Sequence, residues 1–189
     1  MVAIPVDVDP KEGKADATVD LAGKPEFAVS NGQGKVFVNL VDKDKVAVID
    51  TKKMSVTDKW SVAPGKQPVA MSMDHKKNRL FVGCRNQKLV VMDANDGRVL
   101  ANLPIGAGVD STQFVDGTAF ASCSDGTLSV VRETSGDEFE LVQTLKTAPR
   151  AKTMAVDEKT GTIYLPTADG DRRSPVPGSF KVLVVERRK

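Results

Sequence analysis

Short apolar stretches alternate with polar turns rich in Gly, Asn and Asp along the whole chain. No stretch keeps apolar residues at positions i, i+3, i+4 and i+7 through three turns, as an amphipathic helix would. Several stretches are apolar at every position, such as Leu89-Val90-Val91-Met92 and Val182 to Val185. A strand with one face in water alternates apolar and polar side chains, so these runs indicate strands covered on both faces. The pattern predicts an all-β protein.

The strand pattern repeats four times. Each repeat contains a strand, a polar turn and a second strand with an aromatic residue near its middle. The repeats begin at Pro25, Pro68, Val109 and Ala151, and their aromatic residues are Phe37, Phe81, Phe120 and Tyr164. Successive aromatic residues lie 44, 39 and 44 residues apart. A period of about 40–45 residues is typical of the four-stranded blades of a β-propeller.

A second half-repeat follows each segment and supplies further strands, so that a whole blade has strands a to d. The expected fold is a β-propeller of four-stranded antiparallel blades, with about four to five blades in an incomplete, open arc. A single domain is expected over residues 1–189. Its predicted parts are strands c and d of a first blade (1–24), three blades (25–64, 65–107 and 108–148), and a last blade without its outer strand (149–189).

The last predicted strand, Lys181–Glu186, has no strand d beside it. Either Ala15–Leu21 pairs with it and closes a small ring, or the arc stays open. Closure would break the local pairing of Ala15–Leu21 with Val2–Val8, so we expect the open arc. Open strand edges and blade faces recruit partners, so the open arc is expected either to self-associate or to dock on missing N-terminal blades.

The repeated residues resemble the YVTN β-propeller repeat of YncE-like proteins. Three segments carry the resemblance: Val46-Ala47-Val48-Ile49-Asp50, Val62-Ala63-Pro64-Gly65-Lys66-Gln67-Pro68, and Val36-Phe37-Val38-Asn39 in the Y-V-T-N position. The resemblance implies a periplasmic or secreted protein. Complete members have about seven blades and an export signal. This chain shows neither, so it is similar to the C-terminal part of such a protein or to a shortened member, and a cytoplasmic location stays open.

If strand a is innermost, the b–c and d–a loops lie together on the face where propellers bind ligands. The predicted ligand-binding residues in these loops are Arg85, Asp110, Asp125, Arg150, Lys152, Arg172 and Arg173. The last two belong to an unusually long b–c loop, and such insertions are often functional. Arginine offers a planar fork of donors for carboxylate or phosphate, which suggests a small anionic ligand. The alternative is that these cations pair with the equally numerous acids of the same loops.

Chemistry beyond binding has little support in the sequence. One histidine, His75, and two separated cysteines, Cys84 and Cys123, form no transition-metal cluster and no nucleophile–base constellation. We expect no cofactor, no metal, two buried free thiols and a solvated His75 on the opposite face.

Partner classes can be narrowed by charge and hydropathy. The 27 basic and 25 acidic residues are intermixed and aromatic residues make up 5% of the chain, which argues against a nucleic-acid surface. No apolar run approaches the roughly 20 residues of a membrane span.

The expected function is a non-catalytic binding or interaction module, with a ligand or protein partner at the face of the b–c and d–a loops. Two alternatives stay open. One is a lactonase-like or other metal-dependent hydrolase, with acidic residues and a divalent ion in the channel. The other is a weak DNA-binding protein, because DNA binding is attributed to a YncE-like relative.

Overall fold

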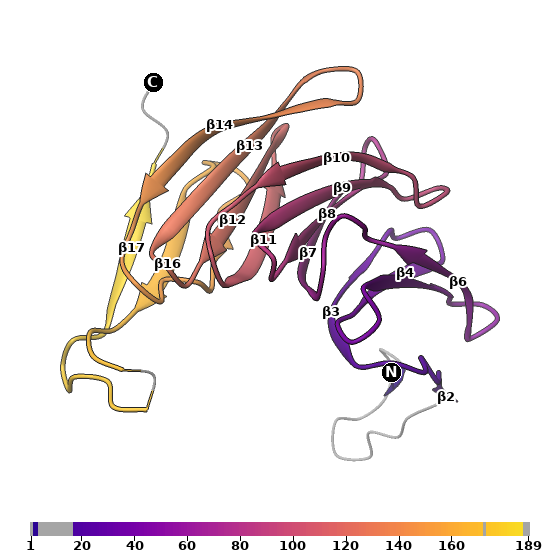
Figure 1. The fold of residues 1–189 in the computed structure, drawn as a ribbon, viewed down its shortest axis with the longest axis horizontal. Coiled ribbons are helices and arrows are strands. Elements are labelled where there is room, and N and C mark those ends of the chain that lie inside the picture. Colours follow the sequence, from indigo (N-terminus) through magenta and orange to yellow (C-terminus); the bar gives the residue numbers. More distant parts are fainter. Residues whose placement is uncertain (1, 4–16, 172, 187–189) are drawn as a thin grey trace.

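A computed structural model describes residues 2–3, 17–171 and 173–186 (Figure 1). Its described residues form strands and turns, with no helix, and hence no helix that could span a membrane. The strands make three four-stranded sheets, one three-stranded sheet and one two-stranded sheet. The four larger sheets stand side by side in an open arc, with β2 and β17 at opposite ends (Figure 1). The predicted open propeller arc of four-stranded blades is therefore confirmed.

Strands pair antiparallel and in chain order within each blade. The blade bounds are as follows: β3 (Pro25–Ser30), β4 (Lys35–Leu40), β5 (Lys45–Asp50) and β6 (Ser55–Ser61) in the first; β7 (Pro68–Asp74), β8 (Arg79–Cys84), β9 (Lys88–Asp93) and β10 (Val99–Pro104) in the second; β11 (Val109–Val115), β12 (Thr118–Cys123), β13 (Thr127–Ser135) and β14 (Glu138–Lys146) in the third; β15 (Ala155–Val156), β16 (Ile163–Thr167) and β17 (Lys181–Val185) in the fourth. The fourth blade has three strands in the described part of the chain, with β17 at its edge.

The N-terminal part is less regular than the sequence pattern predicts. β1 (Val2–Ala3) pairs with β2 (Ala17–Thr18), and most of the predicted strand Val2–Val8 lies outside the described residues. Residues 15 and 16 of the predicted strand Ala15–Leu21 also lie outside the described residues, and its C-terminal part is wrong: β2 ends at Thr18, and the Asp20 carboxylate accepts a hydrogen bond from the Ala22 backbone N–H at 2.8 Å in a turn. Val19 and Leu21 instead bury their side chains against β4 and β5.

Each blade packs on the next through side chains of its second and third strands. Phe37 of β4 joins the apolar residues of β8 and β9, and Phe81 of β8 joins those of β12. Phe120 of β12 packs in turn against β16. The Phe81 ring also stacks on Phe114, with 4.9 Å between ring centroids. The repeated aromatic residue therefore faces the following blade, and its spacing records the blade period.

The first strand of each blade lines the concave side of the arc. β7 contacts β3 on one side and β11 on the other, while β10 meets β14 on the outside (Figure 1). The b–c and d–a loops are joined at one face, where the Arg85 N–H donates to the Gln67 carbonyl at 3.2 Å and the Ser124 N–H donates to the Gly108 carbonyl at 2.9 Å. The predicted placement of these loops on one face is confirmed.

An ion-pair cluster, which we name the Arg79 clamp, joins the second and third blades; Arg79 and Glu133 are nearly buried in it, and Lys77 and Asp137 are half exposed. The Arg79 guanidinium contacts the carboxylates of Glu133 and Asp137 in the long β13–β14 hairpin. It also lies 5.3 Å from the centre of the Phe139 ring. The Lys77 ammonium is 2.6 Å from the second carboxylate oxygen of Glu133. The clamp fixes the hairpin of one blade over the a–b turn of its neighbour.

The clamp makes folding stability depend on pH. Burial by itself would raise the pKa of Glu133, but hydrogen bonds from Lys77 and Arg79 outweigh burial and lower this pKa from its ordinary value. A lowered carboxyl pKa contributes stability that is present above the unfolded-state pKa and is lost as pH falls through the folded-state pKa.

Replacing Arg79→Met should lower the free energy of unfolding by about 3 kcal/mol at neutral pH, because a nearly buried carboxylate loses its main partner. Lys53→Met is a matched control. Lys53 reaches Asp50 at 3.9 Å but is solvent-exposed, so its loss should cost at most about 1 kcal/mol. Urea unfolding measures both variants. The cost of Arg79→Met should shrink as acid protonates Glu133, and equal small costs in the two variants would contradict the clamp.

Candidate functional site

A hollow of about 980 Å³ opens on the concave side of the arc, at the face of the b–c and d–a loops. Strands β3, β7 and β11 and the segment 150–154 surround it. Its lining includes the charged residues Glu26, Arg85, Asp110, Arg150 and Lys152 and the apolar residues Phe27, Val69, Val109 and Met154. Four of the seven predicted site residues therefore meet here, from three different blades. We name this feature the loop-face hollow.

One β-bulge in each of the first three blades shapes the hollow. The first strand carries one extra residue relative to its partner between Pro25 and Ala28, between Pro68 and Ala70, and between Val109 and Ser111. The residues within these bulges are Glu26 and Phe27, Val69, and Asp110, and all of them line the hollow. A bulge redirects side chains and is frequent beside functional sites. The hollow is thus formed where three innermost strands leave regular pairing.

Arg150 is held firmly by the backbone around it. It adopts a left-handed conformation with φ of 65°, and its N–H donates to the Ser124 carbonyl at 2.8 Å. Its guanidinium donates to the Ala168 carbonyl at 2.5 Å, which ties the β14–β15 connection to the loop after β16. The Ser122 hydroxyl donates to the Lys152 carbonyl nearby. The two cations of this segment therefore sit on a braced loop.

The cations of the hollow form ion pairs of different lengths with their acidic neighbours. Lys152 lies 2.6 Å from the Asp110 carboxylate. Arg85 reaches Glu26 only at 4.0 Å, with about half of its side chain in solvent, and such a pair adds little stability in water. The alternative from the sequence was that these cations pair with acids of the same loops. It holds for Lys152, whereas Arg85 is only loosely paired. Arg85 is the cation most available to an incoming anion.

The remaining predicted residues lie elsewhere. Asp125 braces two loops, because its carboxylate accepts hydrogen bonds from the N–H of Ala107 at 2.6 Å and from the N–H and hydroxyl of Thr127 at 3.0 and 2.7 Å. Arg173 is exposed in the loop after β16 and does not line the hollow. Arg172 lies outside the described residues.

Sequence reasoning did not select Glu26, Phe27, Val69 or Met154 as lining residues. The sequence places Glu26 in a d–a connection, which was a usable signal, and the structure places it in the bulge at the start of β3. Phe27 and Val69 occupy the bulges of β3 and β7, and nothing in a repeat period reveals one extra residue in a strand.

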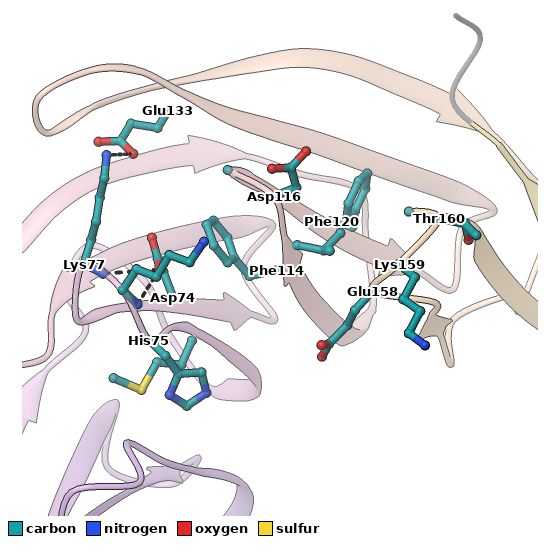
Figure 2. A pocket seen from close by; sticks show the side chains of 15 residues that line it. Asp74, His75, Lys77, Phe114, Asp116, Phe120, Glu133, Glu158, Lys159 and Thr160 are labelled. Carbon is teal, nitrogen blue, oxygen red and sulfur yellow. Dashed lines mark hydrogen bonds and ion pairs between the residues drawn. The ribbon is translucent and has the colours of Figure 1, made fainter.

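A second hollow of about 600 Å³ opens on the opposite face, among the hairpin turns (Figure 2). Figure 2 shows Lys77 extending toward Glu133 at one end and Glu158 and Lys159 at the other. Asp74 accepts hydrogen bonds from the backbone N–H groups of Lys76 and Lys77 at 2.9 and 3.3 Å. Two acids that line this second hollow are thus already engaged, Asp74 in a turn and Glu133 in the Arg79 clamp. This face supplies structural contacts rather than a clear binding geometry.

The histidine and the thiols are placed as predicted. His75 is exposed in the β7–β8 turn, and Cys84 and Cys123 are free and buried. Burial raises the pKa of each thiol to about 12, and the nearby carboxylates of Asp44 and Asp125 add to the shift. Across the described residues, no three His, Cys, Asp or Glu side chains are grouped to hold a metal ion.

The geometry defines a class of protein: an open β-propeller arc with a charged hollow on its concave side. No protein-family model matches the chain, and no curated protein matches its sequence. A chain of hydrazine synthase from Kuenenia stuttgartiensis is similar in structure, with a TM-score of 0.73 and 17% sequence identity. The match covers 91% of this chain and 48% of that one, so the present chain spans about half of its length. At this identity the likeness shows a shared fold alone.

The two aspartates near the hollow should differ in their effect on stability. Asp125→Ala removes a charged acceptor that serves two backbone N–H groups, so unfolding should become easier by about 1–3 kcal/mol. Asp110→Ala breaks one exposed pair and should cost at most about 1 kcal/mol. Thermal unfolding followed by circular dichroism compares them. A larger loss for Asp110→Ala would show that the loop brace is wrongly assigned.

Proposed function

We propose that this protein is a non-catalytic β-propeller binding module that holds a small organic anion in the loop-face hollow. One observation carries the proposal: Arg85 of the second blade meets Arg150 and Lys152 of the segment leading into the fourth blade at a hollow that Phe27, Val69, Val109 and Met154 also line. Concave sites with an apolar lining and a few placed polar groups are the usual form of small-molecule sites.

The lining suggests the chemistry of the ligand. Arg85 offers a planar pair of donors that suits a carboxylate or phosphate, and its present contact with Glu26 is long. Phe27, Val69, Val109 and Met154 suit a carbon skeleton rather than a bare inorganic ion. Glu26 and Asp110 would repel a ligand with high negative charge. The best fit is a singly charged carboxylate with an apolar body.

The hydrolase alternative has less support. It requires a divalent ion held by several acids, whereas the acids lining the hollow are Glu26 and Asp110, each near a cation. The DNA-binding alternative requires a basic surface, whereas cations and carboxylates alternate around this hollow. A binding module requires only charged and apolar lining residues, and the hollow contains both.

We also infer that the repeat is of the YVTN kind and the protein YncE-like. In support, the Val46–Asp50 segment forms β5 and ends in a turn where the Asp50 carboxylate accepts the N–H groups of Lys52 and Lys53, each at 2.9 Å. The Val36–Asn39 segment lies in β4, the strand that carries the blade aromatic. This kinship favours a periplasmic or secreted location.

Benzoate is a suitable probe for the proposed site, with inorganic phosphate as the comparison anion. Isothermal titration should show benzoate binding, and Arg85→Gln should weaken it about tenfold, the loss of one charge-assisted hydrogen bond. The melting temperature of Arg85→Gln should stay close to that of the parent, because Arg85 is exposed and loosely paired.

Arg173→Gln is the matched control, because it removes one exposed arginine outside the lining of the hollow. It should leave benzoate affinity unchanged. If both variants weakened benzoate binding equally, long-range charge rather than contact with Arg85 would explain the loss. If neither benzoate nor phosphate bound at millimolar concentration, the anion site would be refuted.

A further inference from the structure

Three of the five charged residues that line the loop-face hollow make short contacts within the protein. Lys152 lies 2.6 Å from the Asp110 carboxylate. The Arg150 guanidinium donates to the Ala168 carbonyl at 2.5 Å. Short contacts to a charged group are the strong ones, so groups engaged in this way are less available to a ligand. The binding capacity of the hollow therefore depends mainly on the other two charged residues.

Arg85 and Glu26 are these two, and both are loosely paired. The Arg85 guanidinium lies 4.0 Å from a Glu26 carboxylate oxygen, and the exposed Lys24 ammonium lies 3.9 Å from the same oxygen. In the described part of the chain, no shorter ion pair or hydrogen bond engages either side chain. One third of the Glu26 side chain and about half of the Arg85 side chain are exposed. Such contacts add little stability, so a ligand can replace them at small cost.

The surroundings of Glu26 suit a small cation with an apolar body. Glu26 and Phe27 occupy the bulge of β3, and both line the hollow. The Phe27 ring is 41% exposed, and the face of an aromatic ring attracts an ammonium group. Val69 and Met154 line the same hollow and offer apolar contacts. The hollow therefore combines a free cation, a free anion and an apolar lining.

We propose that the ligand of the loop-face hollow is an α-amino acid with an apolar side chain, its carboxylate on Arg85 and its ammonium on Glu26. This inference rests on the proposed binding function and narrows the ligand class. The nitrogen and the carboxyl carbon of an α-amino acid lie about 2.5 Å apart. Its two charges can therefore contact two protein groups that stand 4.0 Å from each other.

The electrostatics of the pair favour this ligand over a simple carboxylate. A carboxylate bound to Arg85 brings its negative charge close to Glu26, and like charges at short distance repel. An α-ammonium group on the ligand turns this repulsion into attraction. A carboxylate without the ammonium group still binds through Arg85, but less tightly.

Isothermal titration of the full chain with L-phenylalanine and with 3-phenylpropionate, the same skeleton without the ammonium group, tests the inference. The parent protein should bind phenylalanine about tenfold more tightly, the contribution of one charge-assisted hydrogen bond. Glu26→Gln should abolish this preference without weakening 3-phenylpropionate binding. Asp110→Asn is the matched control, because it removes the other acid that lines the hollow. It should keep the tenfold ratio, since Lys152 already engages that carboxylate.

The outcomes separate this inference from the proposed function. If 3-phenylpropionate binds and phenylalanine binds no more tightly, the amino-acid inference is overturned and the anion site stands. If neither ligand binds at millimolar concentration, both are overturned. A preference for phenylalanine that survives Glu26→Gln, or that Asp110→Asn abolishes equally, would also overturn the assignment of the ammonium to Glu26. Far-UV circular dichroism establishes that each variant is folded.

Discussion

Packing of one blade face on the next is the interaction on which the rest of this structure depends. Each blade is a single antiparallel sheet, and a single sheet cannot bury both of its apolar faces alone. Phe81 shows how the neighbours solve this, because it is enclosed by the apolar residues of β12, by the Phe114 ring and by the edge of Phe139. The Arg79 clamp then fixes the hairpin that lies over this interface. Stability and blade order thus come from the same contacts.

The loop-face hollow is a consequence of that packing. Interblade contacts hold the first strands beside one another on the concave side, so residues distant in sequence meet there. Glu26 comes from the first blade, Arg85 from the second, Asp110 from the third, and Arg150 and Lys152 from the segment leading into the fourth. No single blade carries the site. The bulges at the start of each first strand then direct Glu26, Val69 and Asp110 to the hollow.

The sequence predicted the features that recur in each blade and missed the contacts that occur in one place only. The aromatic spacing predicted the blades, because the residue that packs on the next sheet recurs at the same strand position. Loop order placed Arg85, Asp110, Arg150 and Lys152 at one face. The Arg79 clamp could not be foreseen, because Glu133 is 54 residues away and its hairpin is longer than those of the other blades. The turn at Asp20 and the loop brace of Asp125 depend on individual hydrogen bonds, from the N–H of Ala22 and of Ala107, that apolar patterning does not encode.

Truncation of the repeated aromatic tests the central claim most directly. Phe81→Ala removes a buried ring from the contact between the second and third blades, and urea unfolding should show a loss of about 3–5 kcal/mol. Phe27→Ala is the comparison, because Phe27 is an exposed phenylalanine of an innermost strand that faces the hollow; it should lose at most about 1 kcal/mol. If the two variants lost similar small amounts of stability, face-to-face packing of blades would not be what holds the arc together.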